Sequence, residues 1–505
     1  MKTKKLILFL MTISIILNLN AQHIGSGLGI HSIAVKNNGA VYTWGFNRYG
    51  QLGNGNTTNS NVPVAVNTSG VLSGKIITQV ATGYYHSIGL SLDGNVYSWG
   101  DNSAGQLGNG TFTGNNVPVA VSTAGVLSGK IITQIAAGGF HSIALASDGK
   151  VYTWGGNHIG QLGTGNTINS NVPVAVDTSG VLSGKIITQI ASGYGHSMAL
   201  ASDGKVYTWG LNSSGQLGNY TYTDSKVPVS IKTSGVLSGK TIVQIAAGSD
   251  HSIALASDGT VYTWGRNDYG QLGNGSFIGS ITEPVAVNTS GVLSGKTIIQ
   301  IAAGYYHSIA LASDGTVYTW GDNTYGQLGN GNNTKSNVPV TVRTVGVLNG
   351  KTIVNIASGS DHSIALASDG TLYTWGRNSS GQLGNGSSTD SNVPVAVDQS
   401  GMGLLTFMED GKLPAVFSLN QNYPNPFNPS TTFEFTIPED GLTTLKIYDL
   451  LGQEIQTIVN EELKSGAYKF NWKASGFPSG IYFYILTFTG TNSNFNSTKK
   501  MVYLR

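Results

Sequence analysis

The sequence contains no cysteine and few charged residues. Without cysteine, the 505-residue chain can form neither disulfides nor thiolate-based metal or catalytic sites, and it lacks the residue that bacterial lipoproteins acylate. Charged residues make up 10% of the chain, and no basic run follows the first few positions. The near balance of charge therefore argues against electrostatic binding to nucleic acid or anionic lipid.

Familiar enzyme signatures are also missing. The chain has no G-x-S-x-G, H-E-x-x-H, Walker or G-x-G-x-x-G motif. We therefore predict no catalytic residue, no cofactor and no metal site, although carboxylates from separate loops could still meet in the folded chain.

Glycine is abundant, with 70 residues and no triplet period. Valine, isoleucine, threonine, tyrosine and tryptophan recur beside these glycines, a pattern typical of short strands joined by tight turns. An all-β fold follows from this composition.

The first 21 residues resemble a signal peptide. Lys2, Lys4 and Lys5 precede an apolar stretch from Leu6 to Leu17, and Ala21 offers a small residue for cleavage. The apolar stretch is shorter than the roughly 20 residues that span a bilayer, although an uncleaved N-terminal anchor is the alternative. Cleavage would remove three of the 27 basic residues. The remaining 24 basic and 25 acidic residues would give the mature chain a net charge of −1.

A single motif repeats seven times along the chain. Its tryptophan recurs every 55 residues, with one interval of 56, and a histidine always lies 13 positions earlier. The tryptophans are Trp44, Trp99, Trp154, Trp209, Trp264, Trp320 and Trp375. The histidines are His31, His86, His141, His196, His251, His307 and His362. Fixed periods of this length are typical of propellers and solenoids.

Each repeat contains four strand-like runs. In the fifth copy these are 242–246, 251–256, 261–264 and 284–287, and Asp258-Gly259 between the second and third runs is a strong hairpin signal. Four antiparallel strands per copy predict a seven-bladed β-propeller, because apolar residues at helical spacing are absent.

The repeats resemble the regulator of chromosome condensation (RCC1) family. The segments that carry the resemblance are H-S-x-A-L, D-G-x-V-Y-T-W-G and G-x-N-x-x-G-Q-L-G, seen at 251–255, 258–265 and 265–273. The resemblance covers about residues 22 to 400 and implies a seven-bladed propeller. Because the first copy lacks a clear opening strand, we expect the segment 403–408, after the last copy, to complete blade 1.

Most of the repeated residues are interpreted as structural. Each tryptophan ends an alternating strand beside a glycine, which favours packing between blades over exposed aromatic platforms. The histidines belong to separate sheets about 10 Å apart, too far for shared metal ligation, since ligand atoms on one metal lie within roughly 4 Å of each other. We therefore expect hydrogen-bonded, structural histidines.

One face of the propeller carries the variable residues. The turn before each histidine and the loop after each tryptophan lie on the same side, and they differ between copies in aromatic, aspartate and arginine residues. Such residues suit a binding surface, although neutral drift in exposed loops explains the variation as well. The candidate ligand face comprises Arg48, Tyr49, Tyr84, Tyr85, Phe140, Tyr194, Asp250, Arg266, Tyr269, Tyr305, Tyr306, Tyr325 and Asp361.

The C-terminal segment has a different composition. Alternating runs at 431–437, 443–448, 467–472 and 481–488 predict a small β-sandwich. N-Y-P-N-P-F-N-P-S-T, K-I-Y-D-L-L-G-Q-E-I, S-G-I-Y-F-Y and the basic ending resemble the type A C-terminal sorting domain of the bacterial type IX secretion system. That resemblance implies export through the periplasm and across the outer membrane, with removal of the domain and either release or attachment to surface lipopolysaccharide.

The expected organisation is a signal peptide (1–21), a propeller (22–408), a linker (409–420) and a sorting domain (421–505). We expect a secreted or cell-surface monomer that binds a protein or polysaccharide, without nucleic acid and without a membrane span in the mature chain. An extracellular polysaccharide hydrolase or lyase is the alternative. Guanine-nucleotide exchange, the activity of the family's namesake, is less favoured because the export signals separate this chain from cytoplasmic GTPases.

Overall fold

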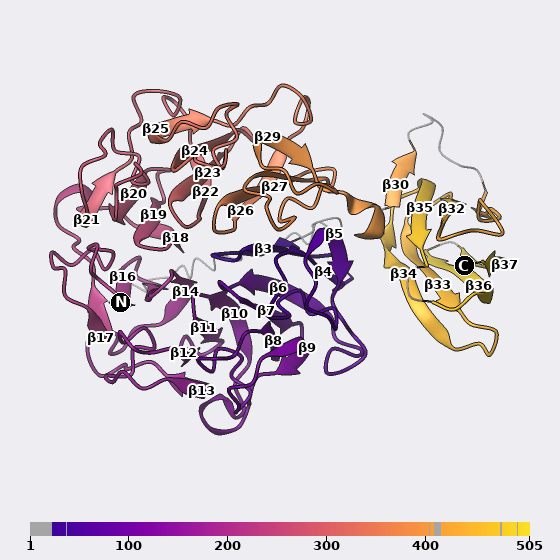
Figure 1. Ribbon diagram of the computed structural model, residues 1–505, viewed down its shortest axis with the longest axis horizontal. Helices are drawn as coiled ribbons and strands as arrows, with labels where there is room; N and C mark the ends of the chain where they lie inside the picture. The colour runs from indigo at the N-terminus through magenta and orange to yellow at the C-terminus, as the bar shows by residue number, and fades with distance from the viewer. Residues whose placement is uncertain are drawn as a thin grey trace, which may run out of the picture.

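The computed structural model of the chain contains two β-rich units, a ring of sheets and a smaller C-terminal pair of sheets (Figure 1). It describes residues 23–36, 38–402, 405–408, 416–474, 477–491 and 493–504. The predicted signal peptide lies outside these residues. Within them, no helix is long and apolar enough to cross a membrane.

Seven sheets, numbered here as blades 1 to 7 in chain order, make up the ring, and each contains four antiparallel strands. The first strands are β1 (His23–Ile24), β6 (Ile77–Thr82), β10 (Ile132–Ala137), β14 (Ile187–Ser192), β18 (Ile242–Ala247), β22 (Ile298–Ala303) and β26 (Ile353–Ser358). The second strands are β3 (His31–Val35), β7 (His86–Ser91), β11 (His141–Ala146), β15 (His196–Ala201), β19 (His251–Ala256), β23 (His307–Ala312) and β27 (His362–Ala367). The third strands are β4 (Val41–Gly45), β8 (Val96–Gly100), β12 (Val151–Gly155), β16 (Val206–Gly210), β20 (Val261–Gly265), β24 (Val317–Gly321) and β28 (Leu372–Gly376). The fourth strands are β5 (Ser60–Ala65), β9 (Asn115–Ala120), β13 (Ser170–Ala175), β17 (Ser225–Ser230), β21 (Ile281–Ala286), β25 (Ser336–Thr341) and β29 (Ser391–Ala396).

The prediction of an all-β propeller followed by a small β-sandwich is confirmed. The fourth strand differs from its predicted bounds in the fifth copy, because it begins at Ile281 rather than at Pro284. The pairing of β20 with β21 shifts between Thr263 and Gly265, and Gly265 pairs with Ile281 beyond that irregularity. A bulge of this kind extends a strand past the point where simple alternation ends.

The expectation that residues 403–408 complete blade 1 was wrong. The strand β30 (Leu405–Met408) pairs instead with β35 (Gly466–Lys473) of the C-terminal unit. The first strand of blade 1 comes from the N-terminal side, where β1 pairs with β3. The neighbouring β2 (Ser26–Gly27) adds in parallel to β6 of blade 2. N-terminal residues thus occupy the place that the C-terminal segment was expected to take.

Each junction between blades is built around a fully buried tryptophan. The indole nitrogen Nε1 of Trp320 donates a hydrogen bond of 2.9 Å to the carbonyl oxygen of Gln271, in the preceding blade. Gly273, two residues later, lies directly against the indole, since a Cβ atom there would be 2.7 Å from ring atoms of Trp320. The same contacts join blade 7 to blade 1, where Trp44 donates to Gln382 and lies against Gly384. The ring therefore closes with the contact that joins its other blades.

A second closed circuit consists of histidine and serine side chains. In each blade the histidine Nε2 lies 2.6–3.0 Å from the hydroxyl of a serine in the next blade, and His362 of blade 7 reaches Ser32 of blade 1. That hydroxyl donates its proton to a glutamine carbonyl, as Ser32 does to Gln382. Nε2 is therefore the protonated ring nitrogen. The other nitrogen, Nδ1, has no hydrogen-bond partner among the described residues.

The C-terminal unit is a β-sandwich. One sheet has the order β30, β35, β32 (Ser430–Ile437) and β31 (Ser418–Leu419). The other has the order β34 (Glu454–Leu463), β33 (Gly441–Tyr448), β36 (Gly480–Gly490) and β37 (Asn494–Tyr503). Phe433, Phe435, Trp472, Tyr484 and Leu486 belong to one buried core between the two sheets. The strands β34 and β37 were not predicted.

Short 3-10 helices occur in three of the loops that follow fourth strands. They are η1 (Gly125–Leu127), η2 (Gly235–Leu237) and η3 (Gln399–Met402). Only η3 leads out of the ring, towards the sandwich (Figure 1).

We expect Gly273→Ala to destabilise the propeller more than Gly275→Ala. Both glycines have positive φ, so each alanine has a backbone cost of about 1–2 kcal/mol. Only at position 273 does the new methyl group collide with an indole, which adds about 1–3 kcal/mol. Denaturant unfolding monitored by tryptophan fluorescence measures the difference. Equal losses in the two variants would contradict the role given to the tryptophan junction.

We also expect the propeller to lose stability as the pH falls below about 6.5. Burial lowers the pKa of His31, His141, His251, His307 and His362 to about 3, and that of His86 and His196 to about 4. Unfolded histidines bind a proton near pH 6.5, whereas the folded ones do not. The free energy of unfolding that depends on the neutral histidines is therefore fully present above pH 6.5 and is lost as the pH falls. At pH 5 the loss is roughly 2 kcal/mol per histidine.

The free energy of unfolding at pH 7 and at pH 5 measures this effect. His251→Asn should reduce the difference by one histidine's share. His158→Asn, at an exposed position, should leave it unchanged. A free energy of unfolding that is equal at the two pH values would contradict the interpretation.

Candidate ligand-binding face

The turns between first and second strands meet around the axis of the ring. Hydrogen bonds between their backbones run from blade to blade: Tyr84 donates to Gly139 at 3.4 Å, Tyr194 to Ser249 at 3.2 Å, and Tyr305 to Ser360 at 2.7 Å. These bonds use no side-chain atoms. The backbone therefore sets the position of each turn, while the side chains of the turn residues remain free to differ between blades.

Aromatic rings from these turns form one continuous cluster. We define the aromatic face as this cluster and the loop rings that join it: Phe46, Tyr49, Tyr84, Tyr85, Phe140, Tyr194, Tyr269, Tyr305 and Tyr306. The rings of Tyr84 in blade 2 and Tyr305 in blade 6 have centroids 6.1 Å apart, so the cluster crosses the axis. Tyr194 lies 5.9 Å from each of these two rings.

The loops after the third strands extend the aromatic face outward. The ring of Tyr49 lies 4.6 Å from that of Tyr85, and the rings of Tyr269 and Tyr306 are stacked at 4.7 Å. Tyr49 is exposed, and the other tyrosines of the aromatic face are half-buried. Burial raises the pKa of Tyr305 to about 12, so its hydroxyl stays protonated and can both donate and accept hydrogen bonds.

Two blades carry Ser-Asp in the turn in place of aromatic residues, and each presents an arginine beside it from the loop after its third strand. In blade 7, Nη1 of Arg377 lies 3.3 Å from Oδ2 of Asp361, and the guanidinium stands over the ring of Tyr325. In blade 5, Nη1 of Arg266 lies 3.7 Å from Oδ2 of Asp250, and it also donates to the hydroxyl of Tyr306. These pairs place both signs of charge beside the aromatic face.

Burial is the main influence on the two carboxylates. It raises the pKa of Asp250 and of Asp361, and the neighbouring arginine lowers the pKa in each case. Each carboxylate also accepts a hydrogen bond from the serine before it, Ser249 or Ser360. Arg266 also forms a shorter ion pair of 2.7 Å with Asp268, so it lies between two carboxylates, whereas Arg377 pairs with Asp361.

The structure brings together most of the residues predicted for the ligand face. The turn residues, Tyr49, Arg266, Tyr269 and Tyr325 all take part in the contacts just described. Arg48 is exposed, and no hydrogen bond or ion pair joins it to the aromatic face within the described part of the chain. Sequence reasoning did not include Arg377, although it occupies the same repeat position as Arg266. Across the described ranges, no group of three metal-ligating side chains occurs.

Beneath the aromatic face lies a cavity of about 270 Å³ around the axis of the ring. Glutamines of the first strands line it and bridge adjacent blades: Gln244 Oε1 accepts from the backbone of Ile301, and Gln300 Oε1 accepts from Ile356. Blade 7 has Asn355 at this position. These amides strengthen the ring from inside, a role that sequence reasoning missed.

Comparison with protein families agrees with this architecture. Residues 69–411 match the RCC1-like domain, residues 38–90 match the regulator of chromosome condensation (RCC1) repeat, and residues 421–503 match the secretion system C-terminal sorting domain. The fold thus defines a propeller joined to a sorting domain. The chain belongs to the RCC1-like domain family.

Similar proteins include the ultraviolet-B receptor UVR8 of Arabidopsis thaliana, 35% identical over 73% of this chain and 80% of the receptor. The human E3 ubiquitin-protein ligase HERC2 is 36% identical over 71% of this chain, which spans only 7% of that ligase. Among solved structures, human WBSCR16 has a TM-score of 0.63 at 26% identity, covering 72% of this chain and 96% of its own. Yeast RCC1 (Prp20) bound to Kap60 has a TM-score of 0.62 at 25% identity, covering 75% and 88%.

We expect Arg377→Met to raise the pKa of Asp361 further, because the variant removes the positive charge that favours the ionised carboxylate. Carboxyl chemical shifts followed during a pH titration measure this change. Arg48→Met is the matched control, because no ion pair joins Arg48 to Asp250 or Asp361 within the described residues. It should leave the titration of Asp361 unchanged. An unaltered titration in Arg377→Met would rule out the pairing.

Proposed function

We propose that this protein is exported to the cell surface or beyond and binds an extracellular protein through the aromatic face. The sorting domain supports secretion or cell-surface localisation. Export by the type IX machinery, through residues 421–505, and removal of the sorting domain are the further steps that we propose.

The observation that carries the binding proposal is the continuous aromatic cluster across the axis. Tyrosine provides a large, rigid contact area with a polar end, and little conformational entropy is lost when it is fixed. Tyrosine and arginine are also enriched among the residues that contribute most binding energy at protein interfaces. Arg266 and Arg377, held beside tyrosine rings, fit this pattern.

The binding partners of two similar proteins favour a protein over a polysaccharide as the ligand. One similar structure contains yeast RCC1 bound to Kap60, and Prp20p of Saccharomyces cerevisiae, in another similar structure, has binding properties to Gsp1p and histones. Those partners belong to those proteins. What we carry over is that proteins containing a propeller of this family bind other proteins.

We propose binding without catalysis. Asp250 and Asp361, the two half-buried aspartates of the turns, are each matched with an arginine. A carboxylate that acts as a general acid usually stands in a setting that leaves it unpaired and raises its pKa strongly. The arginines oppose that rise here.

The test uses the immobilised full chain and a surface extract of the producing cells, divided into protein and polysaccharide fractions. We expect retention of a component of the protein fraction, and loss of at least 100-fold in affinity when Tyr84, Tyr85, Tyr305 and Tyr306 are replaced by serine. Several hot-spot tyrosines at about 2 kcal/mol each account for a loss of this size.

The matched control changes four residues of the opposite face to serine: Lys240, Asp258, Lys296 and Asp314. These form exposed ion pairs, which contribute little to stability. Binding that survives in the tyrosine variant, or that is lost in the control, would refute the assignment of the face. Release of new reducing ends from the polysaccharide fraction would indicate the hydrolase alternative instead.

A further inference from the structure

In each blade we call the turn between the second and third strands the corner. In six of the seven blades, a lysine from the loop before the blade covers this corner. The loop G-V-L-S/N-G-K follows each of the first six fourth strands, and its lysine forms an ion pair of 2.6–2.8 Å with the aspartate of the next Asp-Gly turn. The pairs are Lys75–Asp93, Lys130–Asp148, Lys185–Asp203, Lys240–Asp258, Lys296–Asp314 and Lys351–Asp369. Each of blades 2 to 7 is thus partly covered by the loop that follows the preceding blade.

Blade 1 cannot be covered in this way. The loop after blade 7 begins like the others, but after η3 the chain continues into β30 of the sandwich. The turn of blade 1 carries Asn38 where the other blades have aspartate, and it carries Lys36 where blades 3 to 7 have alanine. The corner of blade 1 therefore differs from the rest in both its covering and its residues.

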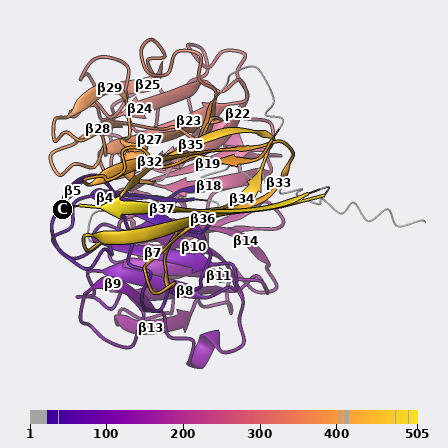
Figure 2. The ribbon, with the colours of Figure 1, turned by 90° about the vertical axis from the view of Figure 1, so that its right-hand side faces the viewer.

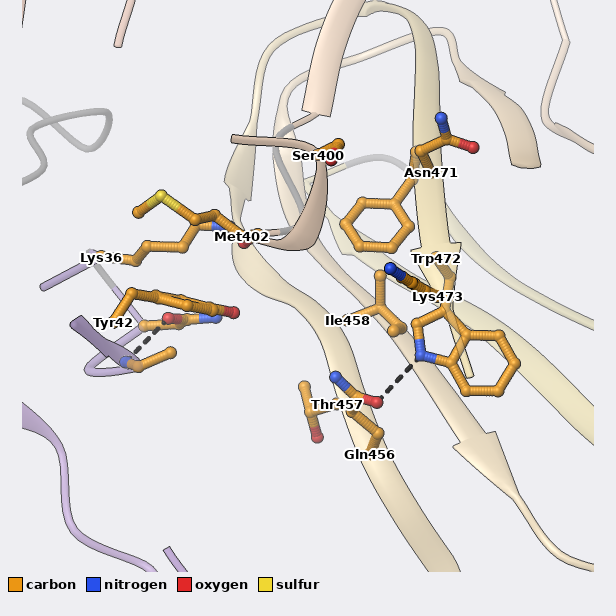
Figure 3. A pocket seen from close by; sticks show the side chains of 13 residues that line it. Lys36, Tyr42, Ser400, Met402, Gln456, Thr457, Ile458, Asn471, Trp472 and Lys473 are labelled. Atoms are coloured by element: carbon orange, nitrogen blue, oxygen red, sulfur yellow. Dashed lines mark hydrogen bonds between the residues drawn. The ribbon is translucent and has the colours of Figure 1, made fainter. Parts of the chain in front are cut away.

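The C-terminal sandwich lies against this corner (Figure 2, Figure 3). Lys36, Tyr42 and Met402 on the propeller side face Ile458 and Trp472 of the sandwich across a cavity of about 70 Å³. The helix η3 packs against β35 on one side and β5 on the other. On the propeller side, Met402 is fully buried among residues of blades 1 and 7.

Lys36 lies on the propeller side of this contact, and Glu461 belongs to β34 of the sandwich. Lys36 Nζ donates a hydrogen bond of 3.1 Å to the carbonyl oxygen of Met402. Burial lowers the pKa of Lys36 while Glu461 of β34 raises it, and burial raises the pKa of Glu461 while Lys36 lowers it. The charge of Glu461 therefore favours the ionised form of Lys36, which burial opposes.

We propose that the corner of blade 1 is a docking site for the chain's own sorting domain, held by the packing of η3 between β5 and β35, with Lys36 and Glu461 as opposite charges on its two sides. The sorting domain occupies the place that a lysine loop occupies on every other blade. The pairing of β30 with β35 holds the connecting segment on the same side. On this proposal the two units keep one arrangement before cleavage, and removal of the sorting domain uncovers Lys36 and Tyr42.

Charge reversal in the full chain tests the docking site. Because the chain has no cysteine, Leu92→Cys and Leu451→Cys, at positions 71% and 91% exposed, introduce two unique spin-label sites, one in each unit. We expect a single narrow distance distribution by electron–electron double resonance. Glu461→Lys or Lys36→Glu should broaden it at least twofold, and the double reversal should restore the narrow distribution.

Glu462→Lys is the matched control, since Glu462 is the exposed neighbour of Glu461 on the same strand. It should leave the distribution narrow. Should Glu461→Lys prevent the sandwich from folding, as judged by circular dichroism, Lys36→Glu and Lys36→Met test the same contact from the propeller side. A narrow distribution in the correctly folded single reversals, or a double reversal as broad as either of them, would overturn the proposal.

Discussion

The whole ring depends on one contact, in which the tryptophan of each blade fits beneath the Q-L-G loop of the blade before it. The indole donates to a glutamine carbonyl and packs against a glycine, so the contact combines a satisfied hydrogen bond with a large buried apolar area. Because Trp44 and Gln382 make it between the first and last blades, the ring closes without exchanging a long strand between the chain ends.

The residues that join the blades are separate from the turn residues at the axis, so the side chains of these turns are free to vary. The tryptophans, histidines and glutamines that join the blades lie in the strands and in the Q-L-G loops, and they are satisfied by partners in adjacent blades. The turn side chains at the axis make no such structural bond in common. Tyr84, Ser249 and Tyr305 can therefore occupy equivalent positions in turns whose backbones are joined by the same kind of hydrogen bond. A scaffold of this kind supports a binding surface whose chemistry is chosen by side chains alone.

A linear repeat closed into a ring must have a first and a last member, and these two differ from the others. Blade 1 receives a short first strand from the N-terminal side, and its corner is covered by the sorting domain rather than by a loop. Asn38 and Lys36 are departures from the repeat at that corner. The position where the chain's internal symmetry is broken is therefore also the position where its second unit is attached.

Much of this protein could be predicted from its sequence, because periodicity and turn chemistry report local structure. The 55-residue period, the Asp-Gly pairs and the residues of the variable turns led to the propeller and to the set of residues that form the aromatic face. The Asn-Tyr-Pro segment and its alternating runs led to a sandwich. These features depend on neighbours in the sequence, and the same signal was repeated in each copy.

Tertiary structure alone decided what depends on distant parts of the chain. Residues 405–408 have the pattern of a blade strand, yet they pair with β35, since β1 already occupies the edge of blade 1. The contact between Tyr84 and Tyr305, the bridges made by Gln244 and Gln300, and the packing of η3 against β5 and β35 join residues far apart in sequence. No local pattern encodes such pairs, because each arises only when separate blades pack together into the ring.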